Sequence, residues 1–211
     1  MHATAKGPIS KRPLHFFAVS SARLFIAVAL PGPVREQLIA LYEPVRGIAW
    51  TRPEQLHLTL RFLGDVEVSL RESLEMSLVR VRVEPFVLPI SGAGSFPARG
   101  PARVLWIGVG HGHTRLYQLR QQVDDAVLAA GLSPDLRYFH PHVTLGRVKD
   151  EAPPGTVAQF LRQNGEFEAA PIRVDAIHLY ASELRPSGAV HTLWRSFALR
   201  GATPAEAEGP A

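Results

Sequence analysis

One four-residue pattern occurs twice in this chain of 211 residues. The first copy is His57-Leu58-Thr59-Leu60, and the second is His142-Val143-Thr144-Leu145. In both copies apolar and polar residues alternate, which is typical of a half-buried β-strand. Because alternate side chains of a strand point to the same face, each histidine is predicted to lie beside its threonine. The apolar residues then occupy the opposite face.

A single His-x-Thr pattern is weak evidence of function, because such short motifs recur by chance and a lone strand histidine is usually structural. Two copies in matching contexts are more specific. Two imidazoles, each with an adjacent hydroxyl, are the groups that acid–base catalysis at a phosphate requires. Histidine titrates near neutral pH, so one ring can carry a proton while the other is neutral.

Composition narrows the class of protein. The chain is 46% hydrophobic and 20% charged, as expected for a globular protein, and its net charge of +4 mildly favours an anionic partner. The absence of cysteine excludes disulfides, thiolate zinc sites and cysteine nucleophiles. The most apolar segment, 15–30, is interrupted by Arg23, and cleavage within it would remove an expected core strand. We therefore expect a cytoplasmic protein that does not interact with a membrane.

The order of predicted elements suggests one bilobal domain over residues 23–199, between an irregular leader (1–22) and tail (200–211). Each half is predicted to run strand, helix, histidine strand, helix, strand. Strands are expected at 23–30, at both motifs, and at 86–96, 104–109, 171–180 and 190–199; apolar spacing predicts helices within 34–45, 70–81, 116–127 and 157–161. The fold class is therefore α+β, with two similar lobes, each a mostly antiparallel sheet with helices on its outer face, facing across a central cleft.

The two motifs and their flanks resemble the 2H phosphoesterase superfamily. Within it they are similar to the bacterial and archaeal RNA 2′,3′-cyclic phosphodiesterases, historically called 2′-5′ RNA ligases. The similarity covers residues 23–199 and rests on the two motifs and on the segments 23–28, 50–51, 56–64, 103–106, 139–147, 179–184 and 186–189.

The resemblance implies metal-independent hydrolysis of RNA 2′,3′-cyclic phosphate ends to 2′-phosphate ends, with reversible 2′-5′ ligation as a related reaction. It implies that His57 is the proton donor, that His142 is the proton acceptor, and that Thr59, Thr144 and Arg147 bind the phosphate. No cofactor and no obligate protein partner are expected, and we expect a monomer acting on RNA ends or cyclic nucleotides.

Strand alternation raises a question about the phosphate-binding cation. Strict alternation from His142 places Arg147 on the opposite face, so the strand must bulge or end at Gly146 for Arg147 to reach the phosphate. Arg61 alternates onto the same face as His57 and is therefore a rival cation. The resemblance favours Arg147.

The sequence also leaves other candidate sites and alternative functions to consider. Six aromatic residues could stack on a base, but strand aromatics usually belong to the core, and only Phe25 and Phe139 are held as candidate contacts to base or phosphate. The histidine pairs at 111/113 and 140/142 suggest a metal-binding site. However, no third histidine or carboxylate lies at the sequence spacing that is typical of a catalytic zinc site. No nucleotide-binding P-loop is present. Alternatives to the RNA enzyme are a phosphodiesterase for small substrates such as ADP-ribose 1″,2″-cyclic phosphate, and a non-catalytic RNA-end-binding module.

Overall fold

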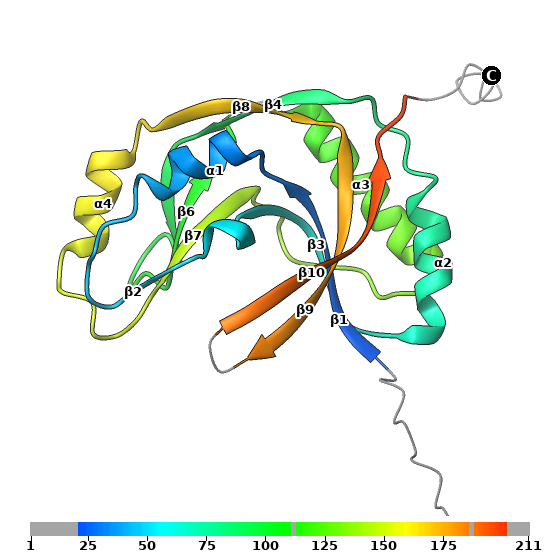
Figure 1. The fold of residues 1–211 in the computed structure, drawn as a ribbon, viewed down its shortest axis with the longest axis horizontal. Coiled ribbons are helices and arrows are strands. Elements are labelled where there is room, and N and C mark those ends of the chain that lie inside the picture. The colour runs from blue at the N-terminus through cyan, green and yellow to red at the C-terminus, as the bar shows by residue number, and fades with distance from the viewer. Residues whose placement is uncertain (1–20, 111–112, 186–187, 202–211) are drawn as a thin grey trace, which may run out of the picture.

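The computed structural model describes residues 21–110, 113–185 and 188–201, and Figure 1 shows their arrangement. The strands are β1 (Ser21–Ala29), β2 (Ile48–Trp50), β3 (His57–Glu67), β4 (Phe86–Ser91), β5 (Ala93–Phe96), β6 (Val104–Gly108), β7 (His142–Val148), β8 (Glu168–Val174), β9 (Ala176–Arg185) and β10 (Gly188–Ala198). The helices are α1 (Gly32–Ile39), α2 (Val68–Leu78), α3 (Thr114–Ala129) and α4 (Thr156–Asn164), with one 3-10 turn, η1 (Pro53–Gln55).

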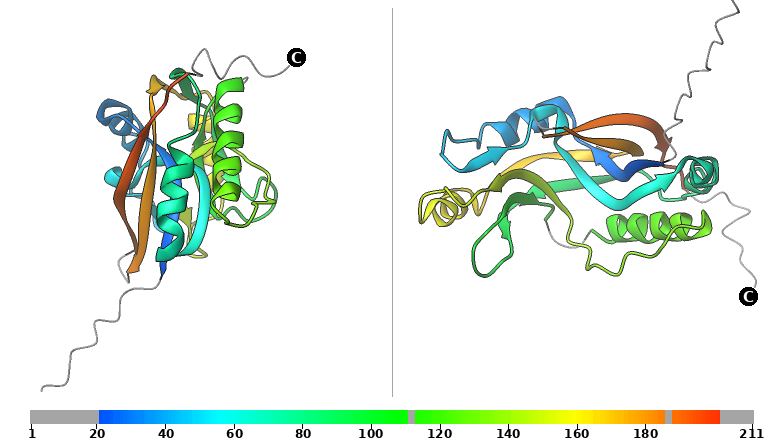
Figure 2. Two further views of the ribbon diagram at one scale, coloured as in Figure 1. Left: turned by 90° about the vertical axis from the view of Figure 1, so that its right-hand side faces the viewer. Right: turned by 90° about the horizontal axis from the view of Figure 1, so that it is seen from below.

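Most strands belong to one large antiparallel sheet. Its order is β10-β9-β1-β3-β7-β6-β5, with β2 also paired to β7, while β4 and β8 form a separate two-stranded sheet. Helices α2 and α3 lie side by side against β3 (Figure 2), whereas α1 contacts β8 and α4 contacts β5. The predicted α+β class, with antiparallel sheets and outer helices, is confirmed.

The two motif strands are neighbours at the centre of this sheet, where Leu58 lies opposite Val143. Strands from the second half of the sequence, β9 and β10, extend the sheet on the side of β3, whereas β5 from the first half pairs with β6. Each side of the site is therefore built from both halves of the chain. The sequence order of elements does not reveal the addition of β9 and β10 to this side, because it depends on the long-range pairing of β9 with β1.

Several predicted boundaries differ from the structure. The segments 86–96 and 171–180 each form two strands in different sheets; Gly92, at φ 77°, breaks the first, and Asp175 separates β8 from β9. The leader boundary was wrong, because β1 begins at Ser21, and Ala22 packs against the core. Residues 1–20 and 202–211 lie outside the described residues. Helices α1 and α2 are shorter than the apolar spacing predicted.

A single hydrophobic core lies against one face of the large sheet. Leu58, Leu60, Val143 and Leu145 from the two motifs are all at most 1% exposed, as period-two alternation predicts. The histidines and threonines between them remain partly exposed on the other face. Burial of the apolar residues thus fixes which face presents the polar ones.

Strand β3 carries a β-bulge three residues after its histidine. Thr59 lies opposite Ala27 and Arg61 opposite Ile26, so Leu60 is an extra residue without a partner on β1. A bulge of one residue reverses the inward and outward alternation for the residues that follow. The Leu60 and Arg61 side chains are consequently both buried.

Strand β7 carries a bulge at the equivalent place. Thr144 lies opposite Trp106 and Gly146 opposite Leu105, which leaves Leu145 as the extra residue. A bulge carbonyl needs a partner outside the regular ladder. The Leu145 carbonyl accepts a hydrogen bond from the backbone N–H of Thr51 at 2.7 Å. The bulge expected from the position of Gly146 is therefore present.

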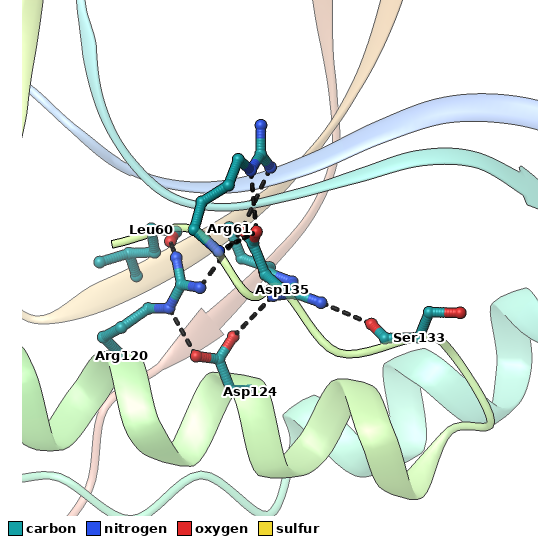
Figure 3. Close-up of polar contacts among 7 residues, drawn as sticks. Leu60, Arg61, Arg120, Asp124, Ser133 and Asp135 are labelled. Atoms are coloured by element: carbon teal, nitrogen blue, oxygen red, sulfur yellow. Dashed lines mark hydrogen bonds and ion pairs between the residues drawn. The ribbon is translucent and has the colours of Figure 1, made fainter. Parts of the chain in front are cut away.

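The bulge in β3 is held by an ionic network in which two arginines are buried and two aspartates are partly buried (Figure 3). Arg120 on α3 donates a hydrogen bond to the Leu60 carbonyl, and its Nε lies 2.6 Å from Asp124. Arg61 Nη1 lies 3.4 Å from both Asp124 and Asp135, and its Nη2 donates to the Ser133 carbonyl at 2.6 Å. The network joins β3, helix α3 and the segment that leads to β7. We call these four charged residues the Arg61 network: Arg61, Arg120, Asp124 and Asp135.

We predict that Arg61→Leu lowers the free energy of unfolding by about 1–3 kcal/mol, because it leaves the Ser133 carbonyl and two partly buried carboxylates with one fewer donor. Urea unfolding measures the loss. The control is Arg103→Leu, which breaks the exposed pair with Asp150 and should cost less than about 1 kcal/mol. Equal losses for both variants would contradict a special contribution of the Arg61 network.

Candidate active site

The two motif histidines are held in the same way. His57 Nδ1 lies 2.7 Å from the carbonyl oxygen of Gln55, and His142 Nδ1 lies 2.7 Å from that of His140. A carbonyl oxygen can only accept a hydrogen bond, so each Nδ1 carries the proton. Each Nε2 is left as the nitrogen that can release or take up a proton.

The register of the central strand pair brings the two motifs together crosswise. Leu58 lies opposite Val143 in an antiparallel pair, so His57 is placed beside Thr144 and Thr59 beside His142. All four polar side chains lie on the face opposite the core. Two imidazoles and two hydroxyls thus share one small region of the sheet surface.

Aromatic rings surround His57. Its ring centroid lies 4.8 Å from that of Phe25, 5.4 Å from that of His191 and 6.3 Å from that of Tyr180. This burial lowers the pKa of His57 to about 4, because a charged imidazolium loses hydration there; the Gln55 carbonyl opposes the shift, and the nearby His191 adds to it. In the unliganded protein His57 is therefore neutral near pH 7.

A different set of aromatic rings surrounds His142. Its centroid lies 4.9 Å from that of Phe96 and 6.2 Å from those of Trp106 and His140. Burial again lowers the pKa below the usual value, the hydrogen bond to the His140 carbonyl raises it, and the His140 ring lowers it. Both rings therefore favour the neutral form until an anion is bound nearby.

The bulges decide which arginine faces the site. Beyond Leu145 the alternation is reversed, and Arg147, opposite Val104, returns to the face of His142 and Thr144. Its side chain is exposed, and the guanidinium has no hydrogen bond or ion pair with any other described residue. The arrangement leaves a free cation at the edge of the site.

The prediction that Arg61 shares the face of His57 was wrong. Strict alternation would place it there, but the bulge at Leu60 turns its side chain toward α3, where it is 3% exposed and engaged in the Arg61 network. The residue that takes the position equivalent to Arg147 is Phe62, five residues after the histidine. Phe62 is 52% exposed, and its ring lies 6.1 Å from that of Phe25.

The structure separates the two aromatic candidates. Phe25 contacts His57 directly, whereas Phe139 packs against Tyr117 and Arg120 and lines a cavity of about 460 Å³ beside the His142 surround. Trp106 and Tyr180, two of the aromatic residues whose strand positions predicted a place in the core, lie near the histidines instead, and no sequence motif singled out His191. Alternation within strands β6 and β9 could have placed the first two. The position of His191 depends on the pairing of β10 with β9 and of β9 with β1.

The metal alternative finds no cluster to support it. No three His, Asp or Glu side chains lie close enough to hold a metal ion within the described ranges. His111 lies outside those ranges.

In the described part of the chain, none of the helices combines the length and apolar character needed to cross a membrane.

Comparisons with known proteins identify the family to which this chain belongs. Residues 30–185 match the family model described as the 2′-5′ RNA ligase superfamily. A Thermus thermophilus protein named RNA 2′,3′-cyclic phosphodiesterase is 37% identical over 202 residues, covering 89% of this chain and 96% of that protein. One of the same name from Methanothermobacter thermautotrophicus is 32% identical over 184 residues, 84% of this chain and 98% of that protein.

Solved structures show the same fold. The structure of TT0787 of Thermus thermophilus superposes with a TM-score of 0.73 at 30% identity, covering 86% of this chain and 100% of that one. The structure of Escherichia coli LigT complexed with 3′-AMP gives a TM-score of 0.69 at 28% identity, covering 85% and 98%.

We predict that His57 titrates near pH 4 in the free protein, and that a bound phosphate anion raises this pKa by favouring the imidazolium. NMR titration of the histidine ring protons, with and without inorganic phosphate, measures both values, and His57→Gln assigns the resonance. Because the folded-state pKa is depressed, this group should weaken folding as pH falls from about 6.5 toward 4. A free-state pKa near 6.5 would contradict the burial effect.

Proposed function

Because the chain belongs to the 2′-5′ RNA ligase superfamily, we propose that it opens RNA 2′,3′-cyclic phosphate ends to 2′-phosphate ends by paired histidine catalysis without a metal ion. The observation that carries the proposal is the crosswise pair of histidines, each with its Nδ1 bound to a carbonyl and its Nε2 available. The relatives named RNA 2′,3′-cyclic phosphodiesterase support the substrate class.

The proposed reaction moves two protons on opposite sides of phosphorus. His142 Nε2 takes a proton from water, the water oxygen bonds to phosphorus, and the bond from phosphorus to the ribose 3′ oxygen breaks. His57 Nε2 gives its proton to that oxygen, and the phosphate remains on the 2′ oxygen. Each proton transfer contributes about 10²–10⁴ in rate. Thr59, Thr144 and Arg147 would bind the phosphate oxygens as charge develops.

Substrate binding would supply the protonated acid. Free His57 has a pKa of about 4, so few molecules carry its proton at neutral pH. The anionic phosphodiester favours an imidazolium beside it, as any opposite charge at short range does. The leaving 3′ oxygen belongs to the donor ribose, so we place the donor nucleoside beside Phe25, Tyr180 and His191 around His57.

Ligation would follow from the same geometry. A 5′-hydroxyl in place of water would give a 2′-5′ linkage by the same two proton transfers.

A cytoplasmic location and a monomeric state remain predictions.

The histidine assignment predicts that His57→Ala and His142→Ala each lower kcat/KM about 10²–10⁴-fold on an oligoribonucleotide with a 2′,3′-cyclic phosphate end. The control, His178→Ala, removes a ring that is hydrogen-bonded to Ser196 and should leave turnover near normal. Chromatography of the products, with EDTA present throughout, should show the 2′-phosphate alone.

Other outcomes would each reject a specific part of the proposal. A 3′-phosphate product would reverse the roles of the two histidines, and loss of activity in EDTA would reject the metal-free reaction. Turnover of ADP-ribose 1″,2″-cyclic phosphate without turnover of RNA ends would favour the small-substrate enzyme. Binding of the oligonucleotide without any turnover would favour the binding module.

The position of Arg147 predicts that Arg147→Ala lowers kcat/KM about 10²-fold, because a preorganised donor to the developing charge is lost. The control is Lys149→Ala, which removes an exposed cation two residues further along the chain. Steady-state kinetics at fixed ionic strength separate the two. Equal effects would mean that only the general positive field matters, and no effect of Arg147→Ala would reject its contact with phosphate.

A further inference from the structure

The cavity of about 460 Å³ on the β7 side of the site is walled mainly by rings. Trp106 from β6, Tyr117 from α3, and Tyr138, Phe139 and His140 from the segment before β7 line it. The rest of the lining comes from residues 91–93, residues 108–110 and Pro141. Its volume falls in the range of about 300–1,000 Å³ that small-ligand sites occupy. The proposed reaction with water leaves this cavity without a role.

The cavity adjoins the proposed base rather than the proposed acid. Trp106 and His140 both line it, and the ring centroid of each lies 6.2 Å from that of His142. Phe25, Tyr180 and His191, which surround His57, do not line it. The two histidines therefore have separate aromatic surroundings.

In an in-line displacement the leaving and attacking oxygens lie on opposite sides of phosphorus. The surroundings of His57 and of His142 should therefore bind different groups. The leaving 3′ oxygen and its ribose lie on the His57 side, and the attacking oxygen approaches phosphorus from the His142 side. A nucleoside in the His142-side cavity is thus an attacking group and not the donor. We infer that this cavity is the acceptor site, which binds the nucleoside of an RNA strand that carries a free 5′-hydroxyl. The inference rests on the proposed function.

The walls suit a nucleobase. Every base has a flat face that stacks on aromatic rings without regard to sequence. Tyr138 is 86% exposed and Tyr117 is 47% exposed, so both rings can be reached from solvent at the mouth of the cavity. The Tyr138 and Tyr117 hydroxyls add donors and acceptors for base edges.

The Arg61 network positions one wall of this site. Arg120 lies over the ring of Phe139, 5.0 Å from its centroid, and Asp135 pairs with Arg137 in the same segment. The segment that carries Tyr138, Phe139 and His140 is thereby tied to helix α3. An acceptor bound there would meet a wall tied to helix α3 by Arg120 and by the ion pairs of Asp135.

The reaction at this site balances without another reagent. The 5′ oxygen bonds to phosphorus, its proton passes to His142 Nε2, the bond to the 3′ oxygen breaks, and that oxygen takes the proton of His57. The products are a 2′-5′ phosphodiester and a free 3′-hydroxyl. Cleavage of a 2′-5′ dinucleoside phosphate is the reverse and needs both sites filled.

The test compares ligation with hydrolysis in Tyr117→Ala/Tyr138→Ala. One oligoribonucleotide ends in a 2′,3′-cyclic phosphate, and a second with a free 5′-hydroxyl is varied in concentration. The double variant should lower the ligation rate at subsaturating acceptor about tenfold, as expected for the loss of base stacking. Hydrolysis of 2′,3′-cyclic AMP should stay within about twofold, because the donor side is untouched. The control is Leu136→Ala, a 94% exposed residue of the same segment that does not line the cavity.

The outcomes separate this inference from the proposed function. Absence of hydrolysis in the unmodified protein would reject the proposed function itself. Normal hydrolysis with no ligation at saturating acceptor, or equal ligation by the double variant and the Leu136→Ala control, would overturn the acceptor site alone. Parallel loss of ligation and hydrolysis in the double variant would assign the cavity to the donor, and would also overturn it.

Discussion

The bulge that follows the histidine motif in each central strand determines which side chains reach this surface. Leu60 and Leu145 each reverse the alternation of their strand, so Arg61 turns toward the core, whereas Phe62 and Arg147, five places after each histidine, turn toward the site. Without the second bulge, Arg147 would point into the core face, where an unpaired cation is costly. The bulges are therefore as much a part of the site as the histidines.

The two bulges are stabilised in different ways, and the difference links the motifs. The Leu145 carbonyl is satisfied locally by the backbone of Thr51, whereas the Leu60 carbonyl is satisfied by Arg120, a side chain of α3. Arg120 and Arg61 also share Asp135, which lies seven residues before His142. The Arg61 network thus connects the first motif to the segment that leads to the second.

The sequence predicted the parts of this structure that depend on local pattern. Alternation in the motifs placed the histidines and threonines on one face, and the position of Gly146 indicated a bulge in β7. The bulge at Leu60 has no comparable glycine, and the residue after it is Arg61, so nothing local opposed its placement on the catalytic face. The addition of the β9–β10 hairpin beside β1, which brings His191 close to His57, depends on a pairing of β9 with β1 more than 100 residues apart in sequence. Local periodicity does not encode that pairing.

The two half-sites are alike in histidine, threonine and bulge, yet they differ at the fifth position after each histidine. Arg147 occupies that position on one strand, and Phe62 occupies it on the other. A phosphate placed between two equal imidazoles could react in either direction, but a cation on one side and an aromatic ring on the other make the two directions unequal. In the proposed reaction the cation would attract the phosphate oxygens toward β7, while the apolar ring of Phe62, next to Phe25, would offer a surface for the donor nucleoside on the β3 side. Under the proposed function, this difference at the fifth position would give a site with two similar histidine strands a defined orientation for its substrate.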